Sequence, residues 1–165
     1  MASNVRFERE LYEPMRVWLH QYLTDKYHGS EILTIDSHAR NLDVFLEENN
    51  VLDFYPQVVG LDIQIDVLGI IKSKRSCKLA FIEAKKTKLN LHDLGQLWAY
   101  CKLCDPEEAF LLSSIGLGSL DKVINLLYRE DLLDFGSGKK IKKMIVAKWS
   151  ISTASIDFSA AVPKM

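Results

Sequence analysis

The run Leu79-Ala80-Phe81-Ile82 constrains the fold most, because four consecutive apolar residues without Gly or Pro are typical of a strand buried on both faces. A carboxylate at Glu83 and an ammonium at Lys85 follow, where a buried strand would still require apolar residues. Side chains alternate along a strand, so Glu83 and Lys85 point to the same face. A buried Glu is costly unless it is paired or binds a metal, and we therefore expect a partner for Glu83.

A second strand is predicted upstream, at residues 61–71, where apolar and polar residues alternate. In this pattern Ile63, Ile65 and Val67 share one face. The polar segment 72–77 follows and suits a hairpin loop. The two strands are therefore expected to pair with each other.

A hairpin that is symmetric about this loop places Ile71 opposite Lys78, and Asp66 opposite Glu83. Cross-strand Cβ atoms lie about 4.5–5.5 Å apart, close enough for two carboxylates to share one divalent cation. Asp62 would instead lie about 13 Å further along the strand. The register favours Asp66, although a bulge or a longer loop would make Asp62 the alternative.

An Asp, a Glu and a Lys in this arrangement are typical of metal-dependent hydrolysis. The carboxylates hold Mg²⁺, the metal activates water and stabilises charge on a phosphate, and the Lys orients the nucleophile or the phosphate. The alternative interpretation is a surface hairpin in which Glu83 and Lys85 form a solvated pair.

The motif Asp66-Val67-Leu68-Gly69, followed by Glu83-Ala84-Lys85 and then by a helix with Gln96 and Tyr100, resembles the PD-(D/E)XK nuclease superfamily over about residues 7–114. The resemblance implies an α/β fold with a central mixed β-sheet flanked by helices. The core would follow the order α-β-β-β-α-β, as in restriction endonucleases.

The resemblance further implies an Mg²⁺-dependent endonuclease that hydrolyses DNA, with Mn²⁺ as a substitute cation. The metal ligands that it implies are Asp66, Glu83, the backbone carbonyl of Ala84 and, through water, Glu10 on the first helix. Lys85 would orient or deprotonate the attacking water, and Gln96 would position the substrate. His38 and Arg40 are phosphate contacts only by this analogy.

One position departs from the family pattern, because Ile65 stands where the family often has Pro, and this keeps Asp62 as an alternative ligand. The motif does not distinguish a restriction enzyme from a repair, junction-resolving or mobile-element nuclease. A catalytically inactive member of the same fold, which binds nucleic acid or protein, is the alternative function. An intact set of Asp66, Glu83 and Lys85 argues against it, because a dead site has no physical need for a costly buried cluster.

Length and composition predict one domain over residues 1–165, with a core at about 5–150 and a loose tail at about 151–165. No apolar run approaches the ~20 residues of a membrane helix, and the first residues lack the apolar stretch of a secretory signal. Three cysteines, an odd number, favour a reducing compartment, so a cytoplasmic location is expected.

The charge distribution is uneven, although the net charge is only −1. Residues 1–66 carry 12 acidic and 5 basic side chains, whereas residues 67–165 carry 10 acidic and 16 basic ones. The basic clusters Lys72–Lys88 and Lys139–Lys148 would form a rim facing DNA phosphates if both lay near Glu83, the alternative being solvated loops. Symmetric cutting of both strands would use two sites, for which a homodimer is the usual arrangement.

Periodicity and turn signals predict the remaining elements. Pro14 is expected to bend or restart the first helix. Asn90 is a candidate N-cap, as is Ser119, whose helix would turn Val123, Leu126 and Leu127 to the core. The helices are expected at 5–23, 43–48, 89–103 and 120–129, and the strands at 32–35, 52–59, 109–114 and 143–149.

Cys101-x-x-Cys104 is a candidate metal or redox motif. Zinc needs four ligands, and only Cys77 and His92 are spare. A redox pair normally lies at a helix N-terminus, whereas these cysteines fall at a helix C-terminus. Buried helix cysteines are the favoured interpretation.

Overall fold

The strand predicted around Leu79–Ile82 lies in the interior of the sheet. In the computed structural model, which describes residues 5–138 and 140–164, β3 (Cys77–Lys85) has six consecutive buried residues. It pairs antiparallel with β2 (Val67–Lys72) and parallel with β4 (Glu108–Ser113). With a neighbour on each side and apolar side chains on both faces, β3 has the environment that its sequence predicts.

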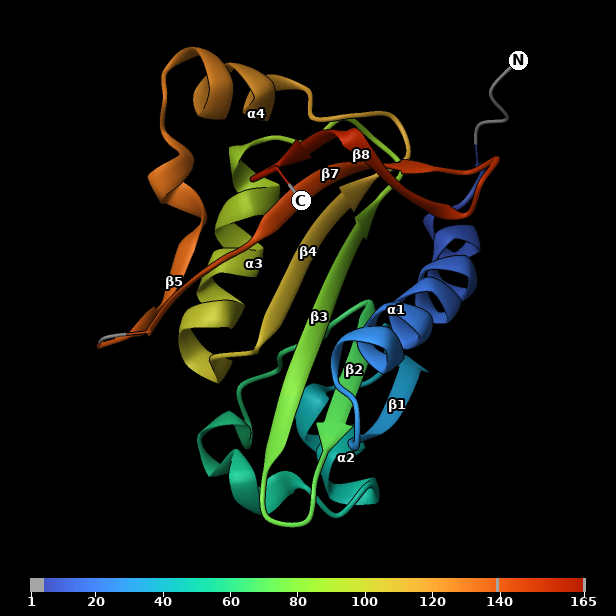
Figure 1. Ribbon diagram of the computed structural model, residues 1–165, viewed down its shortest axis with the longest axis vertical. Helices are drawn as coiled ribbons and strands as arrows, with labels where there is room; N and C mark the ends of the chain where they lie inside the picture. Colours follow the sequence, from blue (N-terminus) through green and yellow to red (C-terminus); the bar gives the residue numbers. More distant parts are fainter. Residues whose placement is uncertain (1–4, 139, 165) are drawn as a thin grey trace.

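The complete sheet has six strands in the order β1-β2-β3-β4-β7-β8 (Figure 1). Pairing is parallel from β3 through β4 to β7 and antiparallel elsewhere, so the sheet is mixed. Helices flank it on both faces, which confirms the α/β class. The other three strands are β1 (Glu31–Asp36), β7 (Ile145–Ser150) and β8 (Ser155–Val162).

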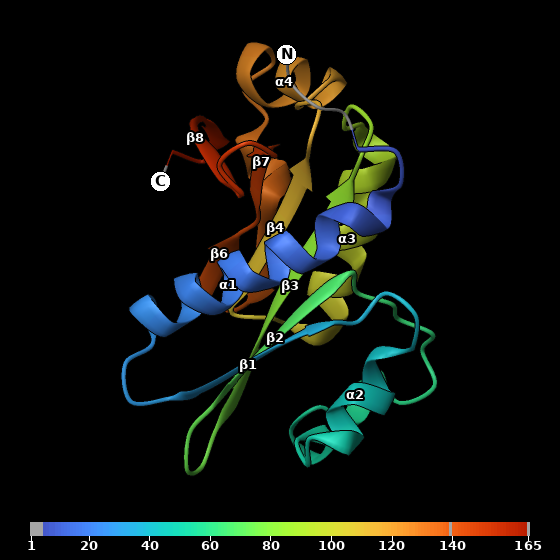
Figure 2. The ribbon, with the colours of Figure 1, turned by 90° about the vertical axis from the view of Figure 1, so that its right-hand side faces the viewer.

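Helix α1 (Tyr12–Lys26) covers one face of the sheet, as Figure 2 shows. Its Met15, Leu19 and Leu23 are fully buried in a cluster that includes Ala80 and Ile82 of β3. A 3₁₀ turn, η1 (Glu8–Leu11), precedes α1. The helix therefore starts in two parts, as Pro14 predicts, and Pro14 itself lies in the first turn, where a missing N–H breaks no helical bond.

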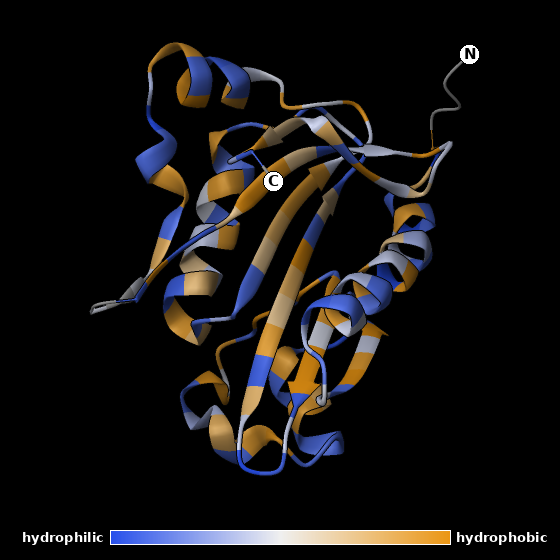
Figure 3. Cartoon of the chain, viewed as in Figure 1, coloured by the Kyte–Doolittle hydropathy of each residue, from blue (hydrophilic) through white to orange (hydrophobic). Residues whose placement is uncertain are grey.

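Helices α2 (Leu42–Glu48) and α3 (Leu91–Cys104) cover the opposite face. There Leu79 and Phe81 of β3 pack in the second cluster of buried residues. The two clusters follow the alternation of side chains along β3. The hydropathy colouring of Figure 3 shows β3 as largely hydrophobic, with hydrophilic residues toward its end.

The β2–β3 register is the predicted one, since Ile71 lies opposite Lys78 and Val67 opposite Ile82. The prediction of a strand over 61–71 is wrong in its first half, because β2 begins only at Val67. Ile63 and Ile65 pack in the cluster beneath α2 and α3, whereas Val67 packs under α1. The irregular segment is held by its contacts with the α2 region, where the N–H of Leu42 donates to the carbonyl of Ile63 at 2.7 Å.

The predicted strand at 52–59 is also wrong. The chain forms two 3₁₀ turns there, η2 (Leu52–Phe54) and η3 (Pro56–Val58). Pro56 lacks an N–H and fixes φ, which suits the first position of a helical turn better than a paired strand. The Tyr55 hydroxyl donates to the carbonyl of Cys77 at 2.8 Å and anchors this segment to the start of β3.

The helix predicted at 120–129 is shorter in the structure, and it turns other side chains toward the core than those predicted. Helix α4 (Ser119–Asp121) continues into a π-helical segment, Lys122–Leu126, and Gly118 rather than Ser119 occupies the N-cap. Leu120 and Ile124 face the core, while Leu126 and Leu127 are exposed. Leu120 and Ile124 are four residues apart, so the buried stripe keeps a helical spacing but lies on a different face from the predicted one. A 3₁₀ turn, η5 (Glu130–Leu133), and the hairpin of β5 (Asp134–Ser137) and β6 (Lys140–Lys143) follow.

The tail predicted to be loose forms strand β8 instead. It pairs antiparallel with β7, with Trp149 opposite Ile156. Ile156, Ala161 and Val162 are buried. The small and polar residues between them conceal the apolar pattern, and pairing removes the open edge that β7 would otherwise present.

No helix in residues 5–138 and 140–164 is long and apolar enough to cross a membrane.

Gly69 marks the closest approach of α1 to the sheet and gives a test of this packing. A Cβ at Gly69 would lie 2.7 Å from Leu23 Cδ1 and 3.1 Å from the Ala80 Cβ. We expect Gly69→Val to lower the free energy of unfolding by about 1–3 kcal/mol, measured by urea denaturation, because the buried Leu23 has no room to move.

Gly95→Ala on α3 is the matched control, because a Cβ there meets nothing within 4 Å. It is expected to raise the free energy of unfolding by about 0.5–1 kcal/mol. Equal effects of the two substitutions would contradict the packing of α1 on β2.

Candidate active site

Asp66 lies directly before β2, where the chain enters the sheet. Its Oδ2 accepts a hydrogen bond from the N–H of Ala84 at 2.8 Å. Its own carbonyl accepts one from the N–H of Ser37 at 3.0 Å, which continues the β1–β2 pairing by one residue. Asp66 is therefore held opposite Glu83 by hydrogen bonds to both neighbouring strands.

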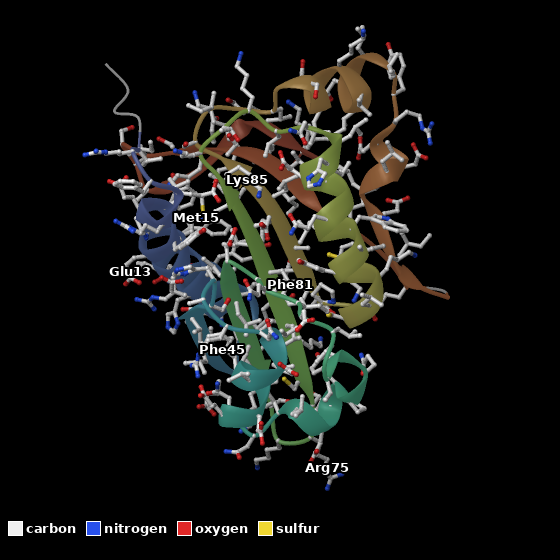
Figure 4. The ribbon with its side chains drawn as sticks, turned by 180° about the vertical axis from the view of Figure 1, so that it is seen from behind. Glu13, Met15, Phe45, Arg75, Phe81 and Lys85 are labelled. Carbon is white, nitrogen blue, oxygen red and sulfur yellow. The ribbon has the colours of Figure 1, made fainter. Side chains whose placement is uncertain are left out.

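Glu83 is buried near the C-terminal end of β3 and shares a face with Lys85, as the alternation predicts. Lys85 Nζ lies 3.5 Å from Glu83 Oε1 and 3.9 Å from Asp93 Oδ1. Figure 4 shows Lys85 near the end of this strand, beyond Phe81. The second oxygen of Glu83, Oε2, is buried and has no hydrogen-bond partner among the described residues.

The electrostatics of the site follow from this burial. Burial raises the pKa of Asp66, against the lowering effect of the hydrogen bond from Ala84. Burial, and then the charge of Asp66, raise the pKa of Glu83 to about 8, against the attraction of Lys85. The two carboxyl groups therefore favour retaining a proton near neutral pH when no cation is bound.

For Lys85, nearby charges affect the pKa more than burial does. Burial disfavours its charge, but the carboxylates of Glu83, Glu8 and Asp93 outweigh this effect and raise its pKa. Lys85 is therefore an ammonium group at neutral pH, able to donate hydrogen bonds and not to accept a proton.

Tyr12, at the start of α1, faces the carboxylates from the other side. Burial first, and then the charge of Asp66, raise the pKa of its hydroxyl, which stays protonated. Its ring lies 4.7 Å from the ring of His38, whose Nδ1 is 2.5 Å from Asp36 Oδ1. Tyr12 was not predicted as a site residue, because an aromatic residue between Leu11 and Glu13 carries no local signal for a role in the site.

The carboxylate that η1 contributes to the site is Glu8 rather than Glu10. Glu8 Oε2 accepts a hydrogen bond from the N–H of Lys86 at 3.1 Å, and the charge of Glu8 raises the pKa of Asp66. Glu10 is exposed, and its Oε2 accepts the N–H of Phe7 at 2.6 Å. Glu10 closes a capping box at the third position of the turn, and its role as a ligand through water stays a prediction.

Helix α3 contributes Asp93 to the site. Asn90 caps the helix as predicted, its Oδ1 accepting the N–H of Asp93 at 3.1 Å. Gln96 Nε2 lies 3.3 Å from the Tyr100 hydroxyl and contacts none of the site residues described above. Asp93 was missed as a site residue, and the signal that could have found it is its place three residues after the cap.

The alternative ligand Asp62 lies elsewhere. It adopts a positive φ of 54° in the irregular segment before β2, and its Oδ1 accepts a hydrogen bond from Asn41 Nδ2 at 3.1 Å. Arg40 pairs with Glu48 at 2.7 Å. The structure thus brings Asp66 to Glu83 and holds Asp62 and Arg40 in other contacts.

The donor set fits Mg²⁺ better than a metal that needs a complete protein cage. Among the described residues, no group of three or more His, Cys, Asp or Glu side chains is arranged to hold a metal. Mg²⁺ typically binds through one or two carboxylates and takes its other ligands from water and phosphate. Asp66 and Glu83 supply two such carboxylates, and the unpartnered Oε2 of Glu83 is the observation that favours a cation there. The backbone group of Ala84 that contacts Asp66 is its N–H and not its carbonyl.

The cysteines show no sign of thiol chemistry. Cys101 and Cys104 are buried near the end of α3, and Cys77 is half-buried at the start of β3. Burial raises the pKa of Cys104 to about 12 and also raises that of Cys101. Reactive thiols need a lowered pKa, so these side chains act as core residues.

The raised pKa of Glu83 predicts a pH dependence of stability in metal-free buffer. The unfolded chain loses this proton near the ordinary value of 4.5, and the folded protein retains it up to about 8. The folded state therefore binds more protons in this window, and the free energy of unfolding falls as pH rises from about 4.5 to 8.

Glu83→Gln should lessen this decline and stabilise the protein at pH 8 by an amount on the order of 2 kcal/mol, measured by urea denaturation with a chelator present. Glu47→Gln, on the exposed side of α2, is the control and should follow the wild type. An unchanged pH profile in Glu83→Gln would contradict the buried carboxyl pair.

Comparison with protein-family models, with curated proteins and with solved structures found no match, so the interpretation of this site rests on its own geometry.

Proposed function

We propose that the protein is an Mg²⁺-dependent endonuclease of the PD-(D/E)XK type that hydrolyses phosphodiester bonds in DNA. The observation that carries the proposal is the approach of Asp66 to the buried Glu83, beside Lys85. Glu83 is buried beside the half-buried Asp66, and its Oε2 has no hydrogen-bond partner among the described residues; this is costly to the fold, and a bound cation relieves that cost.

The order of elements supports the same proposal. Helix α1 is followed by β1, β2 and β3, then α3 and β4, with α2 and the 3₁₀ turns inserted between β1 and β2. This is the α-β-β-β-α-β order that the sequence motif implies. The motif residues lie where two strands of that core meet, Asp66 before β2 and Glu83 in β3.

Asp66 and Glu83 are the residues that would hold the cation, with Mn²⁺ as a substitute for Mg²⁺. The chemistry that such a cation supplies when bound is polarisation of a phosphoryl oxygen and activation of water. The Ala84 N–H orients Asp66, and the Tyr12 hydroxyl faces the same carboxylate.

Lys85 would stabilise the negative charge that develops on the phosphate. It remains protonated in the company of Glu83, Glu8 and Asp93, so it acts as a hydrogen-bond donor and not as a base. Its pairing with Glu83 and Asp93 limits the orientations of its long side chain. Gln96 has no step in this proposal, because its described partner is Tyr100.

The direct test is cleavage of supercoiled, linear and branched DNA with Mg²⁺. The wild type should cut at least one of these, Glu83→Ala should abolish cutting, and Lys85→Ala should lower the rate by about 10²–10³. Lys74→Ala, exposed on the β2–β3 loop, should retain the wild-type rate.

Gel assays of the products would also separate single-strand nicks from double-strand breaks, the result that a homodimer predicts. Binding without cleavage by the wild type would favour the inactive, nucleic-acid-binding alternative. Wild-type cleavage by Glu83→Ala would contradict the site.

Divalent cations provide a test that needs no substrate. Mg²⁺ or Ca²⁺ at about 100 times its dissociation constant should raise the free energy of unfolding by about 2.7 kcal/mol, because only the folded site binds the ion. Thermal denaturation should show this rise in the wild type and its loss in Asp66→Asn.

Asp62→Asn is the matched control and should keep the full effect, because Asp62 lies in another contact. Loss of the cation effect in Asp62→Asn, or its absence from the wild type, would overturn the proposed metal site.

A further inference from the structure

A second polar feature lies beside the candidate active site, at the same end of the parallel strands. It is an open groove of about 870 Å³ between the segment that follows β4 and the last two strands of the sheet, β7 and the edge strand β8. Figure 1 shows these elements together, with α4 close to the ends of β4, β7 and β8. The side chains that matter for its chemistry are Lys88, Lys148, Lys164, Asp121, Asn125 and Ser159.

The strand register connects this groove to the active site. Lys85 of β3 lies opposite Ser113 of β4, and Ser113 lies opposite Lys148 of β7. Val146 packs with the cluster of the α3 face and Ala147 with the other, so Lys148 emerges on the face that carries Glu83 and Lys85. Two strand spacings separate Lys85 from Lys148, which is roughly 10 Å. A phosphate at Lys148 would therefore be a neighbour of a phosphate at Lys85, not the same group.

The floor of the groove is held by short contacts between two connecting segments. The Ser113 hydroxyl donates to the carbonyl of Thr87 at 2.6 Å and accepts the N–H of Ile115 at 3.0 Å. A Cβ at Gly118 would lie 2.5 Å from the carbonyl oxygen of Leu89, so only glycine allows this approach. Lys88 thus projects from a fixed backbone.

The charge of the groove is not neutralised within the protein. Lys88, Lys148 and Lys164 have no carboxylate within 4.0 Å in the part of the chain that the structure describes. The acidic lining residue, Asp121, accepts a hydrogen bond from Asn125 Nδ2 at 2.8 Å. Asp157, opposite Lys148 on β8, accepts the N–H of Ser159 at 3.1 Å. Neither hydrogen bond removes the charge of its carboxylate, but three lysines stand against these two aspartates, so the groove keeps a positive excess.

The lysines at the opposite end of the sheet differ from those of the groove, because they lie near an acidic side chain. Lys78, Lys140 and Lys142 gather around Glu107, at 3.9, 3.3 and 3.9 Å. The predicted basic rim is thus divided: its residues near β6 are paired with acidic groups, while Lys148 faces the groove. Lys139, at the edge of the second cluster, lies outside the described residues.

We propose that this groove binds the phosphodiester backbone of a DNA strand on one side of the bond that the Asp66–Glu83 site acts on. Lys88, Lys148 and Lys164 supply the counter-charge for successive phosphates, whereas the Ser159 hydroxyl already donates to Asp157 Oδ1 at 2.6 Å. The choice of DNA rests on the proposed function. The described lining has no aromatic side chain, so contacts are to the backbone and not to stacked bases, and binding should not depend on base composition.

The test measures, by fluorescence anisotropy, the affinity of the full chain for a fluorescent DNA oligonucleotide. A chelator is present, and the salt concentration is varied between about 50 and 200 mM. The double variant Lys88→Ala/Lys148→Ala should weaken binding about tenfold and reduce the slope of log affinity against log salt by about 2. The control Lys74→Ala/Arg75→Ala removes the same charge from the exposed β2–β3 loop and should leave the slope unchanged. Melting temperatures of all variants check that they are folded.

Equal affinities and slopes in the groove variant and the control would overturn the proposal. So would inorganic phosphate or a mononucleotide binding with the affinity of the strand, since the groove would then be a site for a small anion.

Cleavage assays run in parallel distinguish the two proposals. Groove-dependent DNA binding without cleavage by the wild type supports the groove and contradicts the nuclease. Cleavage and binding that are both unaffected by the groove substitutions support the nuclease and contradict the groove.

Discussion

The burial of Glu83 beside Asp66 is the constraint on which the rest of the site depends. The sheet brings the two carboxylates together, because residues 79–84 of β3 are buried and the register with β2 continues to residue 66 opposite residue 83. Lys85 and the Ala84 N–H offset part of the repulsion, but one oxygen of Glu83 remains without a partner. The surrounding elements act on this pair: η1 brings Glu8, α1 brings Tyr12, and α3 brings the Asp93 that holds Lys85.

At this end of the sheet the backbone is rigid, whereas the charged lysine side chains that project from it are mobile. The connections after β3 and β4 are fixed by the Ser113 hydroxyl and by the close contact at Gly118. The lysines that project from them and from β7 have long side chains and no carboxylate within 4.0 Å in the described chain. Such an arrangement suits a polyanion whose phosphates repeat along a strand, because each ammonium group can adjust while the row as a whole keeps its position.

Sequence reasoning predicted the elements whose signals are local. The unbroken apolar run predicted β3, the polar loop predicted its register with β2, and Asn90 predicted the start of α3. Sequence reasoning failed where the tertiary structure overrides local patterns. Pro56 lies in a 3₁₀ turn and not in a strand, and the residues after Ser152 form an edge strand because β7 offers an unpaired neighbour. In the 3₁₀ turn before α1, Glu8 contacts the N–H of Lys86 while Glu10 caps the turn, a distinction that the sequence pattern did not predict.

The sequence by itself determined that a carboxylate and an ammonium end a buried strand, because apolar runs and alternation are properties of neighbours along the chain. It also favoured Asp66 over Asp62 as the residue that faces Glu83, since a short hairpin leaves little freedom of register, and the structure decided between the two. Only the tertiary structure decided that Asp93 and Tyr12 join the site and that Lys148 lies in one row with Lys85 across three strands. Those contacts join residues far apart in sequence, and their positions depend on how helices pack on the sheet, which no local pattern encodes.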